Sequence, residues 1–205
     1  MMSNSKNFLY FQVLFSDEAR FEVHGQRSQF VRRTVNEPVR PEHMEQHVKY
    51  PDSIMYWGCF SHGGVGPLIA VDGMMNSVKY IGTLRQQAIP ELRKRFPGKS
   101  GIFQQDLAPC HTSKKVREFF NTKKVSVLPW PGNSPDLNPI ENLWAIVKAR
   151  LRAKECSNKT SLNMAINEVW SENDQELAEI CSKLVESMPQ RVQMCLKARG
   201  GHTKY

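Results

Sequence analysis

The sequence contains little that would support a disulfide framework or a zinc site. Its five cysteines are Cys59, Cys110, Cys156, Cys181 and Cys195, and no two of them stand in CxxC spacing. Their number is odd, and the six histidines are equally dispersed. Zinc sites use closely spaced Cys and His residues, and a disulfide framework is typically built from an even number of cysteines, so the pattern argues against both. It fits a protein of a reducing compartment.

Long apolar runs are also missing. The run Phe8–Phe15 near the N-terminus contains Gln12, and it is far shorter than the roughly 20 apolar residues of a membrane-spanning helix. A basic leader and a small-residue cleavage site are absent around it, so a signal peptide is a poor interpretation. We therefore predict that Phe8–Phe15 is a core strand, and we expect no membrane partner.

Positive charge is abundant. The chain of 205 residues has a net charge of +8 and a pI near 9.3, which favours a polyanionic partner. Single basic clusters are typical of solvated helix faces, but together they favour nucleic acid over a membrane, because no helix pairs a basic face with a long apolar one. We expect DNA contacts from Lys114, Lys115, Lys148 and Arg152.

Apolar strands and amphipathic helices follow one another along the chain. Alternation and turn residues predict strands at 8–15, 54–60, 65–71, 102–105 and 125–128. We expect the first strand to end at Ser16-Asp17 and to pair with a hairpin partner at 20–24. Residues 25–53 are expected to hold a short strand at Phe30-Val31 and a long excursion.

A helical pattern begins at Asn76, with Val78, Ile81, Leu84 and Ala88 facing the core, and Pro90 should kink or split it. Further helices are expected after Ser113, from Asn138 to Leu151, and over 161–170, 175–187 and 189–198. This order predicts an α/β fold with a mixed sheet flanked by helices. We expect a core over 1–155 and a helical C-terminal extension over 156–205 packed on the same domain.

Three acidic residues stand where a metal-dependent nuclease would need them. Asp17 and Asp106 each follow an apolar run that predicts a strand, and Glu141 lies in the first turn of a predicted helix. Phosphodiester chemistry needs carboxylates that hold two divalent cations about 4 Å apart. Two alternatives stay open: aspartates are common in turns, and a Glu three residues after Asn138 also suits a capping box.

Two further residues could support such a site. His111 could donate to a phosphate or orient a carboxylate, although a partly buried loop histidine is an equally good interpretation. Asp136 could support the site or cap its loop. Glu18 should point away from Asp17 if that segment remains extended.

Four segments resemble the catalytic domain of DDE transposases of the Tc/mariner superfamily: FSDEARF, MYWGCFSHGGVGPL, FQQDLAPCHTS and LPWPGNSPDLNPIENLW. The C-terminal SMPQRVQMCLKARGGHTKY is similar as well, so the resemblance covers Val13 to Tyr205. A third acid that is Glu, after 34 intervening residues, resembles the Tc branch.

The resemblance implies a ribonuclease H-like fold and cut-and-paste DNA transposition in the nucleus. It implies that Asp17, Asp106 and Glu141 are catalytic and hold two Mg²⁺ ions, with Mn²⁺ as a substitute. Transposon ends and target DNA would be the partners, and the resemblance leaves open whether the chain forms a homodimer.

The sequence departs from the family pattern in two places. Members usually carry a paired helix-turn-helix region before the first aspartate, whereas 16 residues precede Asp17 here, so we expect a catalytic domain alone. Leu107 stands where a small or polar residue is usual. The alternative is a catalytically inactive or co-opted module that binds DNA or protein. A related nuclease acting on other nucleic acid is disfavoured by the SPDLNPIENLW segment.

Overall fold

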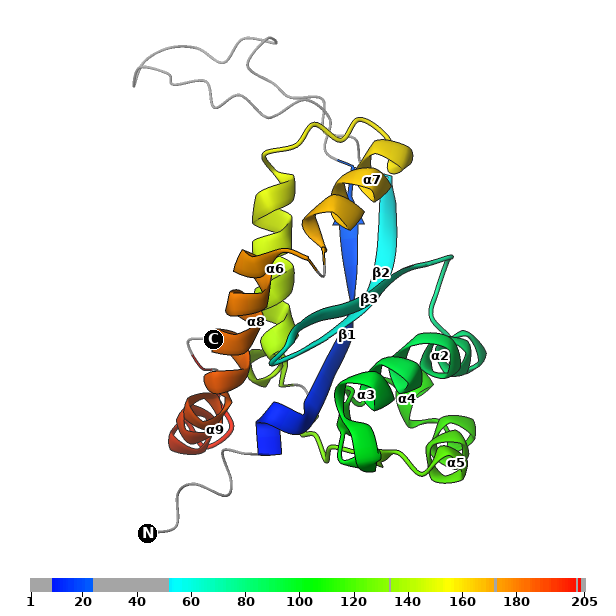
Figure 1. Cartoon of the computed structure of the whole chain (residues 1–205), viewed down its shortest axis with the longest axis vertical. Coiled ribbons are helices and arrows are strands. Elements are labelled where there is room, and N and C mark those ends of the chain that lie inside the picture. Colours follow the sequence, from blue (N-terminus) through cyan, green and yellow to red (C-terminus); the bar gives the residue numbers. More distant parts are fainter. Residues whose placement is uncertain (1–8, 24–51, 133, 172, 202, 204–205) are drawn as a thin grey trace.

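A five-stranded mixed sheet forms the centre of the molecule in the computed structural model, which describes residues 9–23, 52–132, 134–171, 173–201 and 203 (Figure 1). The strands are β1 Val13–Glu22, β2 Ser53–Ser61, β3 Gly64–Val71, β4 Ile102–Gln104 and β5 Ser126–Val127. Their order in the sheet is β3-β2-β1-β4-β5. β1, β2 and β3 are antiparallel neighbours, and β4 and β5 run parallel to β1.

Helices cover both faces of this sheet (Figure 1). On one face lie α6 Pro139–Leu151, α7 Lys159–Val169 and α8 Gln175–Glu186, with α9 Met188–Lys197 beyond them; on the other lie α2 Ser77–Thr83, α3 Ile89–Arg95, α4 Pro109–Thr112 and α5 Lys114–Lys123. Within the described ranges, no helix is both long and apolar enough to cross a membrane.

Alternate residues of β1 belong to two separate hydrophobic cores. Val13, Phe15, Ala19 and Phe21 pack with α6, α7 and α8, whereas Leu14 packs with α2, α3 and α5. This is the two-residue period expected of a strand that is covered on both faces. Residues of the C-terminal part, from Cys156 onward, belong to the first of these cores.

The predicted end of the first strand at Ser16-Asp17 is wrong, and so is the hairpin partner predicted at 20–24, of which residues 20–23 are described. β1 continues through both positions to Glu22, because β2 pairs with it in antiparallel register from Phe15 to Glu22. The predicted start of the strand is also wrong, since Leu9–Gln12 forms a 3₁₀ turn. The strand predicted at Phe30-Val31 lies outside the described residues.

Pro90 splits the long helix as predicted. A π-helical turn, η3 Leu84–Ala88, joins α2 to α3, and the Ile89 N–H donates to the Leu84 carbonyl. The wider turn accommodates a proline that lacks an N–H and would clash with an α-helical carbonyl. Val78 was expected in the core but is 66% exposed, and Tyr80 is buried in its place.

Candidate active site

Asp17 lies on the face of β1 that packs against α6, in line with Phe15 and Ala19. One carboxylate oxygen, Oδ1, accepts the Glu18 N–H at 2.7 Å, and Oδ2 accepts the Asn138 side-chain amide at 3.4 Å. Burial raises the pKa of Asp17 to about 8, together with the negative charge of Glu141 and smaller contributions from Glu18 and Asp106. A carboxyl group in this position therefore favours a proton, or a cation in its place.

Asp106 follows the end of β4, next to Asp17. Phe15 of β1 is level with Gln104 of the parallel strand β4, and each aspartate follows its paired residue by two positions. The Asp106 carboxylate oxygen Oδ1 accepts the Ala108 N–H at 3.0 Å and a hydrogen bond from His111 Nδ1. The His111 bond, with that from Ala108, lowers the pKa of Asp106.

Glu141 lies in the first turn of α6, after the Asn138 cap, and its side chain is exposed. The capping-box alternative is not what the structure contains, because the Asn138 N–H donates to the Pro135 carbonyl at 3.0 Å. Instead, the Glu141 charge is the second-largest cause of the raised Asp17 pKa. The chain thus folds so that Glu141 and Asp106 both act electrostatically on Asp17.

These acids do not form a ready-made metal cluster. In the described part of the chain, no group of three or more His, Cys, Asp or Glu side chains is arranged to hold a metal ion. Two of the three acids are open to solvent, since the Asp106 side chain is 46% exposed and Glu141 is exposed.

The two predicted supporting residues lie in different places. His111 is 3% exposed, and its ring contacts Asp106 through Nδ1 and Glu18 Oε1 through Nε2 at 3.3 Å. Burial alone would lower the pKa of His111, but the hydrogen bonds and charges of Asp106 and Glu18 outweigh it and raise the pKa to about 10. The imidazolium can then donate to both carboxylates.

Asp136 contacts the C-terminal segment instead. Its carbonyl accepts from the buried Arg191 at 3.1 Å, and its carboxylate accepts the Thr203 N–H at 3.1 Å. Its position fixes the short 3₁₀ turn Pro135–Leu137, which leads directly to Asn138. Any effect of Asp136 on the acids therefore passes through the cap of α6.

The residues predicted to contact DNA fall into two groups. Lys114 and Lys115 are exposed at the start of α5, three and four residues after His111. Lys148 and Arg152 are exposed at the other end of α6 from Glu141, and the Lys148 ammonium lies 5.5 Å from the centroid of the Phe21 ring. The first group is thus adjacent in sequence to the Asp106 loop, and the second is remote from it.

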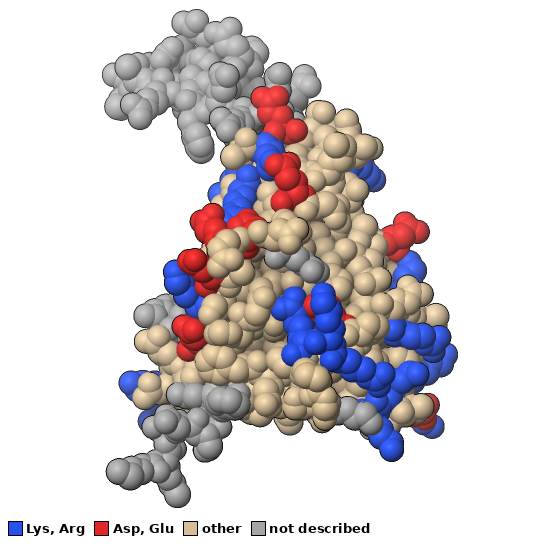
Figure 2. All heavy atoms as spheres, in the orientation of Figure 1, with Lys and Arg blue, Asp and Glu red and all other residues tan. Residues whose placement is uncertain are grey.

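Positive charge is concentrated on one layer of the molecule. Residues 72–124 contain eleven of the 28 Lys and Arg residues but only four of the 20 Asp and Glu residues, so almost all of the net charge resides there. Figure 2 shows Lys and Arg gathered over the region where Figure 1 places α2, α3 and α5. Such a layer would attract a polyanion to the side of the sheet that carries His111.

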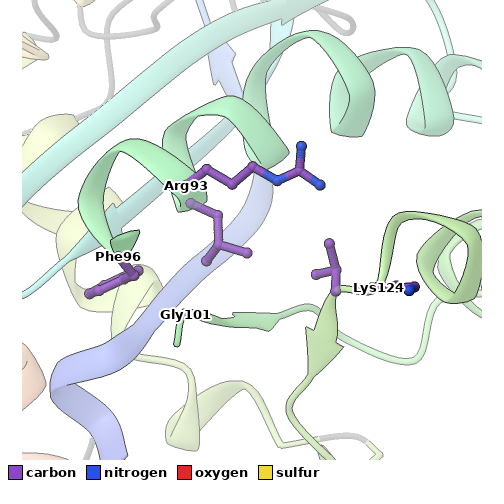
Figure 3. Close-up of a pocket in the computed structure, with 6 residues that line it drawn as sticks. Arg93, Phe96, Gly101 and Lys124 are labelled. Atoms are coloured by element: carbon purple, nitrogen blue, oxygen red, sulfur yellow. The ribbon is translucent and has the colours of Figure 1, made fainter. Parts of the chain in front are cut away.

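The small pocket in Figure 3 is a different feature. Its lining residues are Leu92, Arg93, Phe96, Gly101, Lys124 and Val125. Gly101 and Val125 precede β4 and β5, whereas Asp106 follows the end of β4. The pocket and the acids therefore lie toward opposite ends of these parallel strands.

Three residues of the site neighbourhood were not identified from the sequence. Glu18 was expected only to point away from Asp17, and Tyr80 and Gln105 were not considered. The alternation of side chains along β1 could have placed Glu18 on the layer that contains His111. Tyr80 could have been found from its spacing to Leu84, four residues along the helix.

Comparisons with known proteins identify the family of the chain. Residues 12–163 match the family model described as DDE superfamily endonuclease. The transposable element Tcb2 transposase of Caenorhabditis briggsae is 36% identical over 194 residues, which span 94% of this chain and 70% of that protein.

Two structures of the Mos1 mariner transposase have the same fold. The paired-end complex with Mg has a TM-score of 0.81 at 21% identity, over 96% of this chain and 58% of that one. The isolated catalytic domain has a TM-score of 0.71 at 19% identity, over 96% and 86%. The chain thus spans little more than half of the Mos1 chain in the complex, and the predicted ribonuclease H-like mixed sheet is confirmed. Together with the family match, this shows that the chain belongs to the DDE superfamily endonucleases, as a transposase catalytic domain of the Tc/mariner type.

Proposed function

We propose that this chain cleaves DNA and transfers the cut strand in cut-and-paste transposition, with Asp17, Asp106 and Glu141 as its catalytic, metal-binding residues. The observation that carries the proposal is the placement of the three acids: Asp17 lies on β1, Asp106 follows the neighbouring parallel strand β4, and Glu141 lies in the first turn of the helix that packs on β1. The charges of Glu141 and Asp106 both contribute to the raised pKa of Asp17. Strongly perturbed carboxyl groups cluster at functional sites, because a fold gains nothing from burying an unpaired acid. The relatives named above are transposases, which supports the same reaction class.

The residues suit Mg²⁺, with Mn²⁺ as a substitute. All three donors are carboxylate oxygens, the ligand type that these cations prefer. A cation beside Asp17 would offset the burial and the repulsion that now favour its protonated form. Because the Glu141 side chain is open to solvent, it can rotate toward Asp17 without disturbing the core. We propose two ions per site.

The bound ions would activate the attacking oxygen and stabilise charge on the transferring phosphate. The chain's own residues set the geometry. Asn138 holds one oxygen of Asp17, and Ala108 and His111 hold one oxygen of Asp106. The Asn138 side chain also caps α6, and Ala108 directly precedes α4.

DNA would approach over the basic layer formed by residues 72–124. The helix α5 spans ten residues, or about 15 Å, and begins with Lys114 and Lys115 close in sequence to the Asp106 loop. At its other end, the Arg93 guanidinium donates to the Lys123 carbonyl at 3.3 Å, which brings the basic ends of α3 and α5 together. Phosphate contacts of this kind give affinity and orientation without sequence information.

Partners and location follow from the same reaction. Transposon ends and target DNA would be the substrates, and the paired-end complexes of Mos1 support a homodimer that joins two ends. A nuclear location is proposed because the substrate would be chromosomal DNA.

A joining assay tests the proposal. The chain would be incubated with labelled duplexes that carry a free 3′-hydroxyl and with supercoiled plasmid, in Mg²⁺ or Mn²⁺. We expect joined products that disappear with EDTA. The variant Asp106→Ala should lose more than about a hundredfold in rate, since a group that stabilises transition-state charge is removed. The exposed Glu179 of α8 provides a control, and Glu179→Ala should keep the parent's rate.

The alternative function predicts a different result. A non-catalytic or co-opted module would bind the labelled duplex, but it would neither nick nor join the plasmid with either ion. Equal activity of Asp106→Ala and the parent would instead show that the chain is an enzyme but that Asp106 is not part of its active site.

A further inference from the structure

Glu18 and Asp17 are neighbours on β1 but serve opposite faces of the sheet. Asp17 is in line with Phe15 and Ala19, toward α6. Glu18 is in line with Leu14, toward the layer of α2, α4 and α5, and its side chain is only 15% exposed. There its Oε1 atom lies 3.3 Å from Nε2 of His111.

His111 therefore lies between two carboxylates that come from different elements. Nε2 contacts Glu18 of β1, and Nδ1 contacts Asp106 of the loop after β4. The two strands are level along Val13–Phe15, and Ser16 adds hydrogen bonds from its N–H and its hydroxyl to Gln104. Beyond Ser16, the side-chain bridge through His111 continues the connection between β1 and the β4 segment.

The imidazole itself is held on its remaining sides. Its ring packs on Tyr80, with ring centroids 4.0 Å apart and planes inclined by 32°. The Tyr80 hydroxyl donates to Gln105 Oε1 at 2.8 Å, and the Gln105 amide donates to the His111 carbonyl at 3.1 Å. Tyr80 is fully buried. Ring and main chain of His111 are thus fixed by one connected network.

We infer that His111 is a positioning residue, which sets the distance between Asp106 and the strand that carries Asp17. It engages Asp106 through Oδ1, which Ala108 also engages, so that Oδ2 would be the oxygen that binds a metal. This inference rests on the proposed metal-dependent function. Partners of this kind orient a ligand before the metal arrives, and their loss typically weakens metal binding by about 10- to 100-fold.

Substitutions at 111 can separate the two contacts. In His111→Asn the side-chain amide takes the place of Nδ1 and can still donate to Asp106, whereas in His111→Gln it reaches toward the place of Nε2 and can donate to Glu18. We expect His111→Gln to bind Mn²⁺ about 10- to 100-fold more weakly than the parent. His111→Asn should bind Mn²⁺ more tightly than His111→Gln.

Glu18 provides a second, independent pair. Glu18→Gln and Glu18→Ala both remove the charge beside Asp17, but only Gln keeps an oxygen that can accept from Nε2. Mn²⁺ binding should therefore be weaker in Glu18→Ala than in Glu18→Gln. This pair keeps the inference testable if variants of the buried histidine fail to fold.

The measurement is Mn²⁺ titration followed by electron paramagnetic resonance and calorimetry, with urea unfolding of each metal-free variant alongside. A structural histidine without a positioning role would lower the unfolding free energy and leave the Mn²⁺ affinity of the folded fraction unchanged, and that result overturns the inference. Equal affinities within the Glu18 pair overturn it as well. If the parent binds neither Mn²⁺ nor Mg²⁺, the proposed function itself fails.

Discussion

Asp17→Asn should stabilise the metal-free chain at neutral pH. Burial and the nearby acids raise the pKa of Asp17 to about 8 from 3.8. Below about pH 4 the group is protonated in both the folded and the unfolded chain, and it costs nothing. As the pH rises toward 8, the folded chain retains a proton that the unfolded chain has lost, so stability falls. Asparagine has the same shape and no proton to lose.

The size of the effect follows from the pKa difference. Each pH unit between the two pKa values costs about 1.4 kcal/mol, which gives on the order of 4 kcal/mol at pH 7. The variant also loses the acceptor for the Asn138 amide, a 3.4 Å contact, at a cost of about 1 kcal/mol. We therefore expect a net gain of about 3 kcal/mol in unfolding free energy at pH 7, or roughly 6–12 °C in Tm for a chain of this size.

Urea unfolding in EDTA from pH 4 to pH 8 measures this directly. The difference between Asp17→Asn and the parent should be absent or slightly unfavourable at pH 4 and should grow as the pH rises. The control variant Asp72→Asn, at an exposed position, should follow the parent throughout. Added Mg²⁺ should raise the stability of the parent more than that of Asp17→Asn, because only the parent offers the charged ligand. A difference that does not change with pH would refute the raised pKa assigned to Asp17.

Two further predictions concern packing and DNA binding. Gly58→Ala should destabilise the chain by about 1–3 kcal/mol by urea unfolding, since the added Cβ would lie 2.6 Å from the Trp144 ring. Gly82 lies in a helix, and a Cβ added there would have nothing within 4 Å, so Gly82→Ala should stabilise the chain by up to about 1 kcal/mol. A Gly58→Ala variant more stable than the Gly82→Ala variant would contradict the packing. Titration of unrelated duplexes should give weak, salt-dependent binding with a Kd of about 10⁻⁴ to 10⁻⁶ M at physiological salt. Lys114→Gln and Lys115→Gln should each flatten the log–log salt slope by roughly 0.9, and an unchanged slope would exclude these residues from the phosphate contacts.

Several elements of the fold could be predicted from local sequence because local physics determines them. β2 and β3 begin and end within one residue of the predicted 54–60 and 65–71, since apolar runs bounded by a Gly63-Gly64 turn leave little choice. The start of α6 follows from Asn138 and Pro139, a cap and a first-turn proline. In both cases the signal and the structure lie within a few residues of each other.

The misplaced end of β1 has a non-local cause. Ser16, Asp17 and Glu18 are three successive polar residues, and local rules favour a turn there. They stay extended because residues of β2, some forty positions away, supply the hydrogen bonds along the whole segment. The Val78 error has a similar origin, because the π-helical turn before Pro90 and the packing against His111 decide which helix residues are buried.

The acids themselves were identified from their sequence context, but their relation to one another depends on the sheet. Asp17 and Asp106 lie on adjacent segments only because β1 and β4 are parallel neighbours in a register that pairs Phe15 with Gln104. Glu141 acts on Asp17 because α6 packs against the same face of β1. No spacing along the chain contains that information.

β1 connects the candidate site to both layers of the protein. Its Asp17 meets the α6 layer through Asn138, and its Glu18 meets the opposite layer through His111. Both contacts lie in closely packed surroundings, with Trp144 against Gly58 on one face and Tyr80 against His111 on the other. Because packed cores resist small displacements, a carboxyl group at this place can keep its position although its charged form is unfavourable there. The stability lost at Asp17 and the rigidity supplied by its neighbours are thus two consequences of the same position in the sheet.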